Sequence, residues 1–435
     1  MTDSEKILAA GCAAGAAAAA IPAAYALSQN LKRKPLGEHD FIRAENGEFV
    51  SECGEKVVFR GINLNDDIMN FEKYDLAPDS NNQQIFASLE SRFGRYGARE
   101  LMKKHYASFI SDADLKKIQK LGANCVRVPL QYKLLCRKDN CKGDIDFDKL
   151  DGIVEKCRKL GIYVIFDLHC APGAQNRDSA FAEGEESSFF KSGKEGFEAR
   201  NAAIRLWTQV AAHFCDEPAV AAYDLLNRPL NKMPQPPESI DILHKFYRRA
   251  LKAIRTVDAR HTVIMQAAYG IETLPDAEKL GGENVAFGLY SHFHTTFETD
   301  ALMNAINEKK GAIPFIICKV RAEENIDYSL TAFNGNNISW LFGDYKGNGM
   351  NFVYSADISP ANLDIDKYDE IGEKWSKPVA TKNFAENKEL TKLLKAKYKD
   401  NQPSIPEKAE KSKPKISVKF GKTTIIGTRK KLPER

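Results

Sequence analysis

Polar side chains that can bind ligands or carry charge come at the ends of short apolar runs throughout the middle of the sequence. Three of them, Arg127, Arg228 and Lys319, are cations. An arginine exchanges no proton at neutral pH, and a lysine acts as a nucleophile mainly toward carbonyl carbons, when its pKa is depressed. We expect all of these polar residues to share one site: Asn63, Arg127, His169, Asn227 with Arg228, His292 with His294, Lys319 and Asp344.

The apolar runs alternate with longer amphipathic stretches, and this alternation predicts βα units with a parallel sheet covered by helices. Eight such units fit an α/β fold of the (β/α)8 TIM barrel type, in which the carboxyl ends of the strands build the active site. A doubly wound open sheet is the alternative, but no Gly-x-Gly-x-x-Gly motif follows the first strand. The predicted strands are 57–64, 124–130, 163–169, 220–226, 262–267, 285–293, 313–320 and 338–345, and the clearest helices are 112–121, 147–160, 199–215 and 239–257.

Four stretches at these strand ends carry a more specific signal. They are residues 59–64, 126–129, the long motif 167–176, and 225–230, which reads Leu-Leu-Asn-Arg-Pro-Leu. Together they resemble glycoside hydrolase family 5, particularly its exo-β-1,3-glucanase-like members, over residues 41 to 398. The resemblance implies a retaining reaction on β-linked glucose polymers, with one glutamate at the end of the fourth strand and another at the end of the seventh. A pair of carboxyl groups about 5 to 5.5 Å apart supplies the acid and the nucleophile of such a reaction.

Both of the glutamates that the resemblance implies are replaced. Arg228 stands at the expected acid/base position and Lys319 at the expected nucleophile position. His294 and Gly343 depart from the family's tyrosine and from its sugar-stacking tryptophan. Residues that match the family pattern, and are expected to bind substrate, are Arg127, His169, Asn227 and His292.

Four other carboxylates lie near enough in the sequence to replace the missing pair. Asp224 lies three residues before Asn227, so strand alternation predicts that it faces away from the site. Glu323 and Glu324 would need the following loop to fold back, which leaves Asp344 as the best single substitute. One carboxylate supports at most a weak or inverting-type reaction. The ordinary retaining route is therefore expected to be closed.

Three functions follow from this pattern. The first is a pseudoenzyme that binds a carbohydrate or an anionic ligand, such as a uronic acid or a phosphorylated or sulfated sugar, in the former cleft. Two cations about 5 Å apart at an effective dielectric of about 20 would repel by roughly 3 kcal/mol, so either nearby acids or a bound anion should offset them. The pseudoenzyme could also bind a partner protein through the former cleft. The second function is an active β-glucan hydrolase with relocated carboxylates, and the third is a membrane-anchored scaffold with an unused cleft. No motif for a cofactor, a metal or a nucleic acid is apparent.

The two ends of the chain differ from its middle. In 435 residues with 43% hydrophobic and 28% charged side chains, a soluble globular domain is expected at 37–400. Residues 1–36 hold an apolar, alanine-rich stretch, 7–27, that fits either a membrane anchor or a cleaved signal segment, so the protein is expected to be membrane-associated or exported, on a side that the sequence leaves open. Residues 401–435 form a basic linker and tail with a possible hairpin at 416–427. Most of the nine cysteines fit buried free thiols, while Cys136 and Cys141 could close a short loop.

Overall fold

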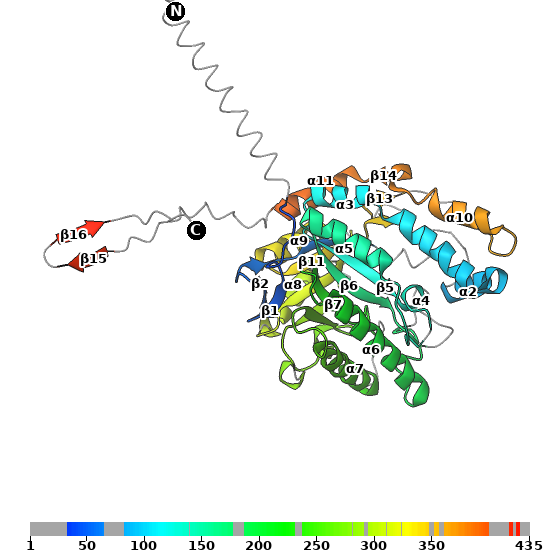
Figure 1. Ribbon diagram of the computed structural model, residues 1–435, viewed down its shortest axis with the longest axis horizontal. Helices are drawn as coiled ribbons and strands as arrows, with labels where there is room; N and C mark the ends of the chain where they lie inside the picture. Colours follow the sequence, from blue (N-terminus) through cyan, green and yellow to red (C-terminus); the bar gives the residue numbers. More distant parts are fainter. Residues whose placement is uncertain are drawn as a thin grey trace, which may run out of the picture.

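The protein is described from a computed structural model in which the placed residues are 33–64, 82–138, 140–176, 187–230, 237–280, 282–290, 295–309, 311–322, 324–347, 352–355, 361–399, 417–420 and 423–426. Eight parallel strands form a closed barrel, because the last of them pairs with the first (Figure 1). The predicted (β/α)8 fold is confirmed. In the order of the chain the barrel strands are β4 (Arg60–Asn63), β5 (Cys125–Gln131), β6 (Tyr163–Cys170), β7 (Val220–Asp224), β8 (Thr262–Gln266), β9 (Val285–Tyr290), β10 (Phe315–Val320) and β11 (Ser339–Phe342).

Helices surround the barrel, and the four that the sequence predicted most clearly are present. An apolar stripe on each faces the strands, as in α3, where Leu115, Ile118 and Leu121 are buried. α3 ends at Gly122, whose φ of 109° suits a residue without a side chain. The helices are α2 (Asn82–Phe109), α3 (Asp112–Leu121), α4 (Tyr132–Leu135), α5 (Asp148–Leu160), α6 (Lys194–Phe214), α7 (Pro237–Arg255), α8 (Thr296–Lys309), α9 (Ile326–Gly335), α10 (Tyr368–Ser376) and α11 (Lys388–Lys399), with short 3-10 turns at Ile271–Thr273, Ala277–Lys279 and Thr381–Asn383.

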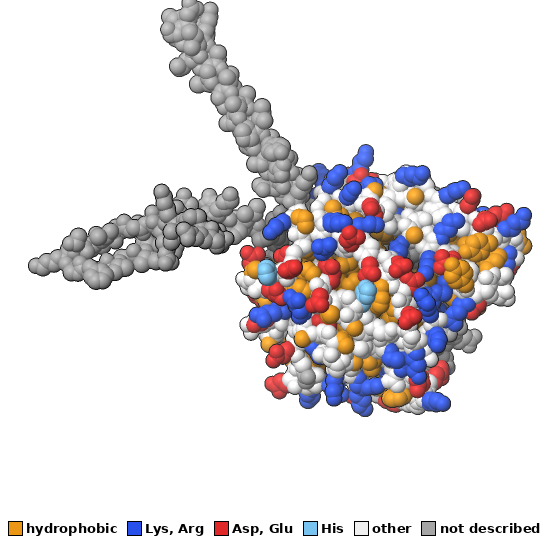
Figure 2. All heavy atoms as spheres, viewed as in Figure 1, with side chains coloured by type: hydrophobic (Ala, Val, Ile, Leu, Met, Phe, Trp, Pro, Cys, Tyr) orange, Lys and Arg blue, Asp and Glu red, His pale blue; other side chains and the backbone are white. Residues whose placement is uncertain are grey.

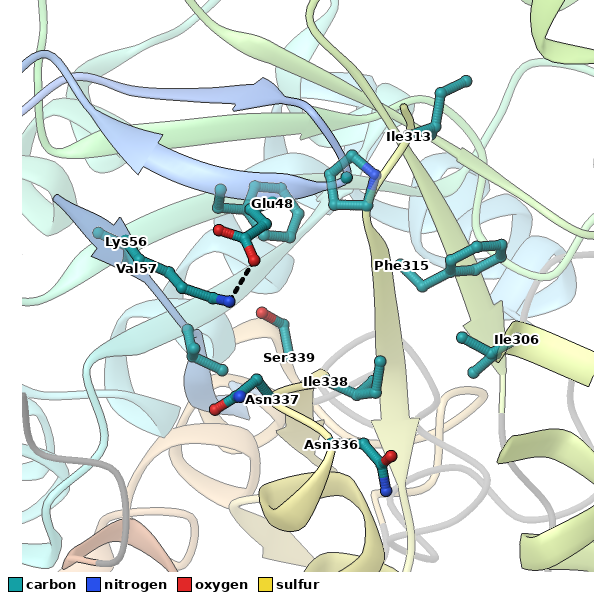
Figure 3. A pocket seen from close by; sticks show the side chains of 14 residues that line it. Glu48, Lys56, Val57, Ile306, Ile313, Phe315, Asn336, Asn337, Ile338 and Ser339 are labelled. Carbon is teal, nitrogen blue, oxygen red and sulfur yellow. Dashed lines mark hydrogen bonds and ion pairs between the residues drawn. The ribbon is translucent and has the colours of Figure 1, made fainter. Parts of the chain in front are cut away.

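A small antiparallel sheet, which the sequence analysis did not predict, closes the amino-terminal end of the barrel. It consists of β1 (Ile42–Glu45), β2 (Glu48–Ser51) and β3 (Lys56–Val57). Ile42 and Phe49 point into a core cluster with the apolar side chains of the barrel interior. A hollow of about 50 Å³ lies beside this sheet. Figure 3 shows its lining, with the ion pair between Glu48 and Lys56 at its edge. The barrel is thus closed at this end, and a ligand has to approach from the other.

Two further sheets lie outside the barrel. β12 (Lys346–Gly347), β13 (Tyr354–Ser355) and β14 (Ala385–Glu386) form a short sheet that follows the last barrel strand. In the tail, β15 (Ser417–Phe420) pairs antiparallel with β16 (Thr423–Ile426), which confirms the predicted hairpin. None of the helices among the placed residues is long and apolar enough to span a membrane, and residues 7–27 lie outside that part of the chain.

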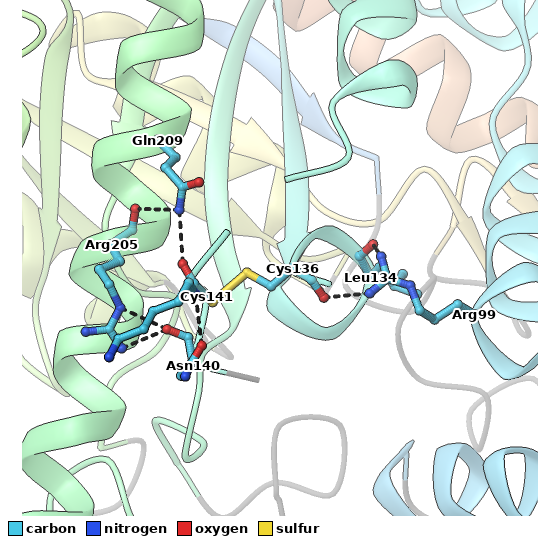
Figure 4. The surroundings of a disulfide bond; sticks show 8 residues. Arg99, Leu134, Cys136, Asn140, Cys141, Arg205 and Gln209 are labelled. Carbon is cyan, nitrogen blue, oxygen red and sulfur yellow. Dashed lines mark hydrogen bonds between the residues drawn. A yellow bond between two sulfur atoms is a disulfide. The ribbon is translucent and has the colours of Figure 1, made fainter. Parts of the chain in front are cut away.

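Cys136 and Cys141 form a disulfide, so the predicted short loop is closed. Both cysteines are buried, and Figure 4 shows the contacts that hold the loop between α2 and α6. Arg99 donates to the carbonyl oxygens of Cys136 and Leu134, at 2.5 and 2.8 Å. From the other side, Arg205 and Gln209 donate to the carbonyls of Asn140 and Cys141. Other cysteines fit the expected free thiols, with Cys125, Cys157, Cys170 and Cys318 buried.

Candidate functional site

Arg127 lies at the centre of a buried polar cluster inside the barrel, toward the carboxyl ends of the strands. Its guanidinium donates to Asp224 Oδ2 from Nε at 3.0 Å and from Nη2 at 2.6 Å, and Nη2 also lies 2.7 Å from Asp167 Oδ1. The same Nη2 donates to the Asn227 amide oxygen at 3.1 Å. One cation therefore holds side chains from β5, β6 and β7 together, and all three ionised side chains have an exposed fraction of 1% or less.

The expectation that Asp224 faces away from Asn227 is wrong, because both side chains contact Arg127. Strand β7 ends at Asp224, so the two-residue alternation on which the expectation rested does not continue to Asn227. Gln266 of β8 donates to the same Asp224 oxygen at 2.7 Å. Asp224 thus belongs to the site, although the hydrogen bonds around it hold it beneath the strand ends.

The shared cation changes the pKa values within this cluster. Burial by itself lowers the pKa of Arg127, but Asp167 and Asp224 outweigh that effect and raise it above its ordinary value. Burial raises the pKa of Asp224 to about 6, against the opposing charge of Arg127, and the nearby negative charge of Asp167 adds to the increase. The cluster is therefore one coupled electrostatic unit.

His169 is oriented by the same cluster. Its Nδ1 lies 2.5 Å from Asp167 Oδ2, so we assign the ring proton to Nδ1 and leave Nε2 as an acceptor. The Asn227 amide nitrogen is 3.4 Å from Nε2. His169 and Asn227 are each almost fully buried, with exposed fractions of 2% and 0%. The structure therefore brings together three of the four predicted substrate-binding residues, Arg127, His169 and Asn227.

Arg228 follows Asn227 in a turn, and two hydrogen bonds from side chains fix the backbone of Arg228. Its N–H donates to Gln266 Oε1 at 3.0 Å, and its carbonyl accepts from Asn176 Nδ2 at 2.9 Å. Its φ is 45°, in the left-handed region that residues with side chains adopt rarely. The guanidinium lies over the ring of Tyr290, the last residue of β9, at 4.6 Å from the ring centroid. The turn therefore directs this half-buried cation toward the end of β9.

Lys319 occupies the end of β10, and its ammonium is held by a carboxylate from the neighbouring strand end. Nζ lies 2.7 and 2.8 Å from the two oxygens of Asp344, and the exposed fractions of the two side chains are 1% and 4%. Asn63, on the far side of the barrel from Arg228, donates to the carbonyls of Cys318 and Phe342 and accepts from Arg127. This amide links the Lys319 region to the Arg127 cluster.

Gly343 leaves the space that the Lys319 side chain fills. A Cβ atom built at Gly343 would lie 2.5 Å from Lys319 Cε and 2.6 Å from Lys319 Cγ, which is closer than real contacts allow. The lysine and the glycine are therefore sterically linked. A large side chain at position 343 requires a different residue, or a different conformation, at position 319.

The remaining predicted site residues fall into two groups. His292, His294 and Glu323 lie outside the placed residues, so their positions stay predictions. Glu324 is exposed. Asp167, the first residue of the motif 167–176, belongs to the site but was not predicted as a site residue, although its spacing of two from His169 places both side chains on one face of β6. Among the placed residues, no group of three His, Cys, Asp or Glu side chains has the arrangement of a metal site.

Comparison with known proteins adds an independent line of information. The family model for cellulase (glycosyl hydrolase family 5) matches residues 88–351, more than half of the chain. The beta-xylosidase of Phanerodontia chrysosporium is 29% identical over 259 residues, which cover 58% of this chain and 52% of that protein. The glucan 1,3-beta-glucosidase of Candida oleophila is 28% identical over 189 residues, 41% of each chain. The chain thus spans about half the length or less of these curated relatives.

A solved structure supports the architecture alone. The crystal structure of an endogalactoceramidase aligns with 77% of this chain and 84% of that one, at a TM-score of 0.52 and 18% sequence identity. The family match itself runs from α2 to just beyond β12 and so contains every strand end from β5 to β11. With the barrel, the Arg127 cluster and the matched region in agreement, the chain belongs to glycosyl hydrolase family 5.

Proposed function

We propose that the protein is a catalytically impaired member of its family that binds a carbohydrate in the cleft at the carboxyl ends of the barrel strands. The observation that carries the proposal is the ion pair between Lys319 and Asp344. The ammonium of Lys319 stands at the position where the family resemblance implies the nucleophilic carboxylate. It contacts both carboxylate oxygens of Asp344, the residue that the sequence favours as a substitute for that nucleophile.

The chemistry of a retaining glycosidase needs two carboxyl groups, one to protonate the leaving oxygen and one to attack the anomeric carbon. Arg228 stands at the expected acid/base position and has no proton that it can give at neutral pH. Asp167, Asp224 and Asp344, the carboxylates at the placed strand ends, are each within 3 Å of a cation. This argues against the second candidate, an active hydrolase with relocated carboxylates.

Binding of a sugar is supported by the polar side chains that remain. His169 and Asn227 are fixed by Asp167 and Arg127 before any ligand arrives, so their hydrogen-bonding atoms lose little freedom on binding. Arg228 follows Asn227 and lies over the ring of Tyr290, so its positive charge would favour an anionic sugar over a neutral one. A β-glucan-like chain that carries a negative group near Arg228 is the ligand class that this arrangement favours.

We also propose that the protein is exported from the cytosol. Disulfides persist in oxidising compartments, and the Cys136–Cys141 pair supports a location outside the reducing cytosol. A polysaccharide ligand is also met there. Whether residues 7–27 stay as an anchor or are removed as a signal is decided by the amino-terminal sequence of the mature protein.

The test of the proposal is turnover and binding by the wild type and by a repaired variant. Arg228→Glu and Lys319→Glu restore the two carboxylates, and Asp344→Asn must accompany them, because Asp344 would otherwise face a second negative charge. We expect an inert wild type that binds oligosaccharides, and a triple variant that cleaves aryl β-glucosides or β-1,3-glucan.

Turnover by the wild type on any of these substrates would contradict the proposal. A wild type that neither cleaves nor binds any member of a neutral and acidic oligosaccharide panel would favour the scaffold instead. Asp344→Asn alone is the matched control, because it changes the ion pair without adding a catalytic carboxylate.

A further inference from the structure

A groove on the outer face of the barrel, away from the strand ends, lies between α6 and α7. Its volume is about 620 Å³. In Figure 2 Lys and Arg side chains gather over the lower part of the molecule, where Figure 1 places these two helices. We call it the basic groove, and the residues that line it are Phe197, Arg200, Ile242, Lys245, Phe246, Arg248, Arg249 and Lys252.

The charged residues of the basic groove are all positive. Five of its eight lining residues are Lys or Arg, and no Asp or Glu is among them. Burial lowers the pKa of Arg200, and the nearby charge of Arg249 lowers it further, which is the effect of like charges held close together. No other placed side chain forms an ion pair with Lys245, Arg248 or Lys252. A ligand with negative charge would offset this crowding.

The floor of the basic groove is apolar. The Phe197 side chain is 49% exposed, Ile242 is half-buried, and Phe246 is buried beneath them. Arg249 covers part of Phe197, with its guanidinium 5.2 Å from the ring centroid. A concave surface with apolar side chains below and cations along its rim matches a partner that offers apolar and acidic groups side by side.

The cations of α7 follow the helical repeat. Lys245, Arg248, Arg249 and Lys252 are spaced at i, i+3, i+4 and i+7, so they form one stripe along roughly 10 Å of helix. An antiparallel or parallel helix with acidic residues at the same spacing would place a carboxylate opposite each of them. Its neighbouring apolar residues would then face Phe197 and Ile242.

We propose that the basic groove binds an amphipathic acidic helix of a partner protein. A helix laid in a groove is recognised by apolar anchors at the helical repeat, while complementary charges fix its orientation and speed its association. A sulfated or uronic polysaccharide would satisfy the cations but would gain little from the apolar floor. The proposal concerns the outer face of the barrel and is independent of what the cleft binds.

The test uses a displayed library of helical peptides of about four turns, in which acidic, basic and apolar residues vary on one face. Selection on the full-length protein is expected to enrich peptides with acidic residues at i, i+3 or i+4, and i+7 beside Leu or Phe. Selection on Arg248→Glu/Lys252→Glu is expected to lose that enrichment. The matched control is Lys392→Glu/Lys395→Glu, the same reversal of two exposed charges on α11, which should enrich the same peptides as the wild type.

A selected peptide then allows the two contributions to be separated. We expect the charge reversal on α7 to weaken its binding at least about tenfold, and Phe197→Ser to weaken it several-fold with a smaller dependence on salt. Circular dichroism verifies that each variant is folded, and Arg248→Gln serves as a milder change if the reversal is not.

Two outcomes would overturn the proposal. The first is a selection on the wild type that enriches no acidic amphipathic sequence. The second is heparin or polyglutamate binding as tightly as the selected peptide with no effect of Phe197→Ser, which would make the groove a general polyanion surface.

Discussion

Two groups of strands, two halves of the carboxyl end of the barrel, differ in the site residues that they hold. On β5, β6 and β7, the cation Arg127 is shared by two aspartates and an amide. Arg127, His169 and Asn227, which match the family pattern, lie together there, although Arg228 stands at the expected acid/base position. On β10 and β11, a single lysine and a single aspartate neutralise each other above a glycine. The first half keeps an arrangement that can present hydrogen bonds to a sugar. In the second half, Lys319 and Gly343 stand where the family resemblance implies a carboxylate and an aromatic side chain. Under the proposed function, binding of a sugar would therefore be separable from its cleavage.

The largest effect is expected from removing the shared cation. Arg127→Ala would leave two buried carboxylates without their partner, and we expect a loss of about 5 kcal/mol in the free energy of unfolding, at the upper end for a broken buried pair. Denaturant titration followed by circular dichroism measures it. Arg43→Ala, in the exposed pair with Glu45 on β1, is the control and should cost under about 1 kcal/mol. A cost as small as that for Arg127→Ala would mean that the cluster does not stabilise the fold.

The second half should behave as an isolated pair. Lys319→Met leaves Asp344 buried and uncompensated, at an expected cost of about 3 kcal/mol, and adding Asp344→Asn should recover most of that loss. In the Arg127 cluster, by contrast, adding Asp224→Asn to Arg127→Ala should recover less, because Asp167 stays charged. The two double-mutant cycles therefore distinguish a pair from a network, and equal recovery in both would remove the distinction.

The pH dependence of stability sharpens the first half of the comparison. The Asp224 pKa of about 6 lies above the unfolded value of about 3.9, so between these values the folded protein holds a proton that the unfolded chain has released. This group's contribution is therefore present below about pH 4 and is lost as the pH rises through about 6, by about 3 kcal/mol. Subtracting the stability curve of Asp224→Asn from that of the wild type isolates the contribution. Parallel curves between pH 4 and pH 6 would show that the carboxyl is ionised throughout.

A smaller effect tests the packing of the second half. Gly343→Ala places a methyl group against the Lys319 side chain, and we expect a loss of about 1 to 3 kcal/mol in the free energy of unfolding. In a Lys319→Ala background the same substitution should cost much less, since the obstructing atoms are gone. If the cost were the same in both backgrounds, the lysine would not be what fills the space above Gly343.

The smallest effect on stability is expected at Arg228. Arg228→Ala removes a cation from the face of Tyr290, which is worth about 0.5 to 1 kcal/mol in a partly exposed setting. Its effect on ligand binding should be larger for acidic than for neutral oligosaccharides, as isothermal titration would measure. Arg228→Lys retains the charge and serves as the control, and equal losses for both ligand types would argue against an anionic sugar.

The barrel was predictable because its strands are apolar runs bounded by polar strand ends and amphipathic helices. The sequence pattern could not show where a strand stops, and the orientation of Asp224 was wrong for that reason: β7 ends at residue 224, two residues before the predicted end. Hairpin β1–β2 was missed because two of the four residues in Ile42–Glu45 are charged, and the segment becomes a strand only by covering the barrel interior. The family positions of Arg127, His169 and Asn227 could be identified from their motifs. The contact of Lys319 with Asp344 depends on two strands that are neighbours only in the folded barrel.

The chain enters the barrel domain at the pole opposite the carboxyl ends of the strands. Arg33 donates to the carbonyl of Gly122 and Leu36 donates to that of Arg158, both just ahead of barrel strands. Tyr398, near the end of α11, packs against the same glycine, so the first and last parts of the barrel domain meet at its closed pole. A surface that held the protein through the residues just before Arg33 would meet this pole. The carboxyl ends of the barrel strands, where we propose that a carbohydrate binds, would then face away from that surface.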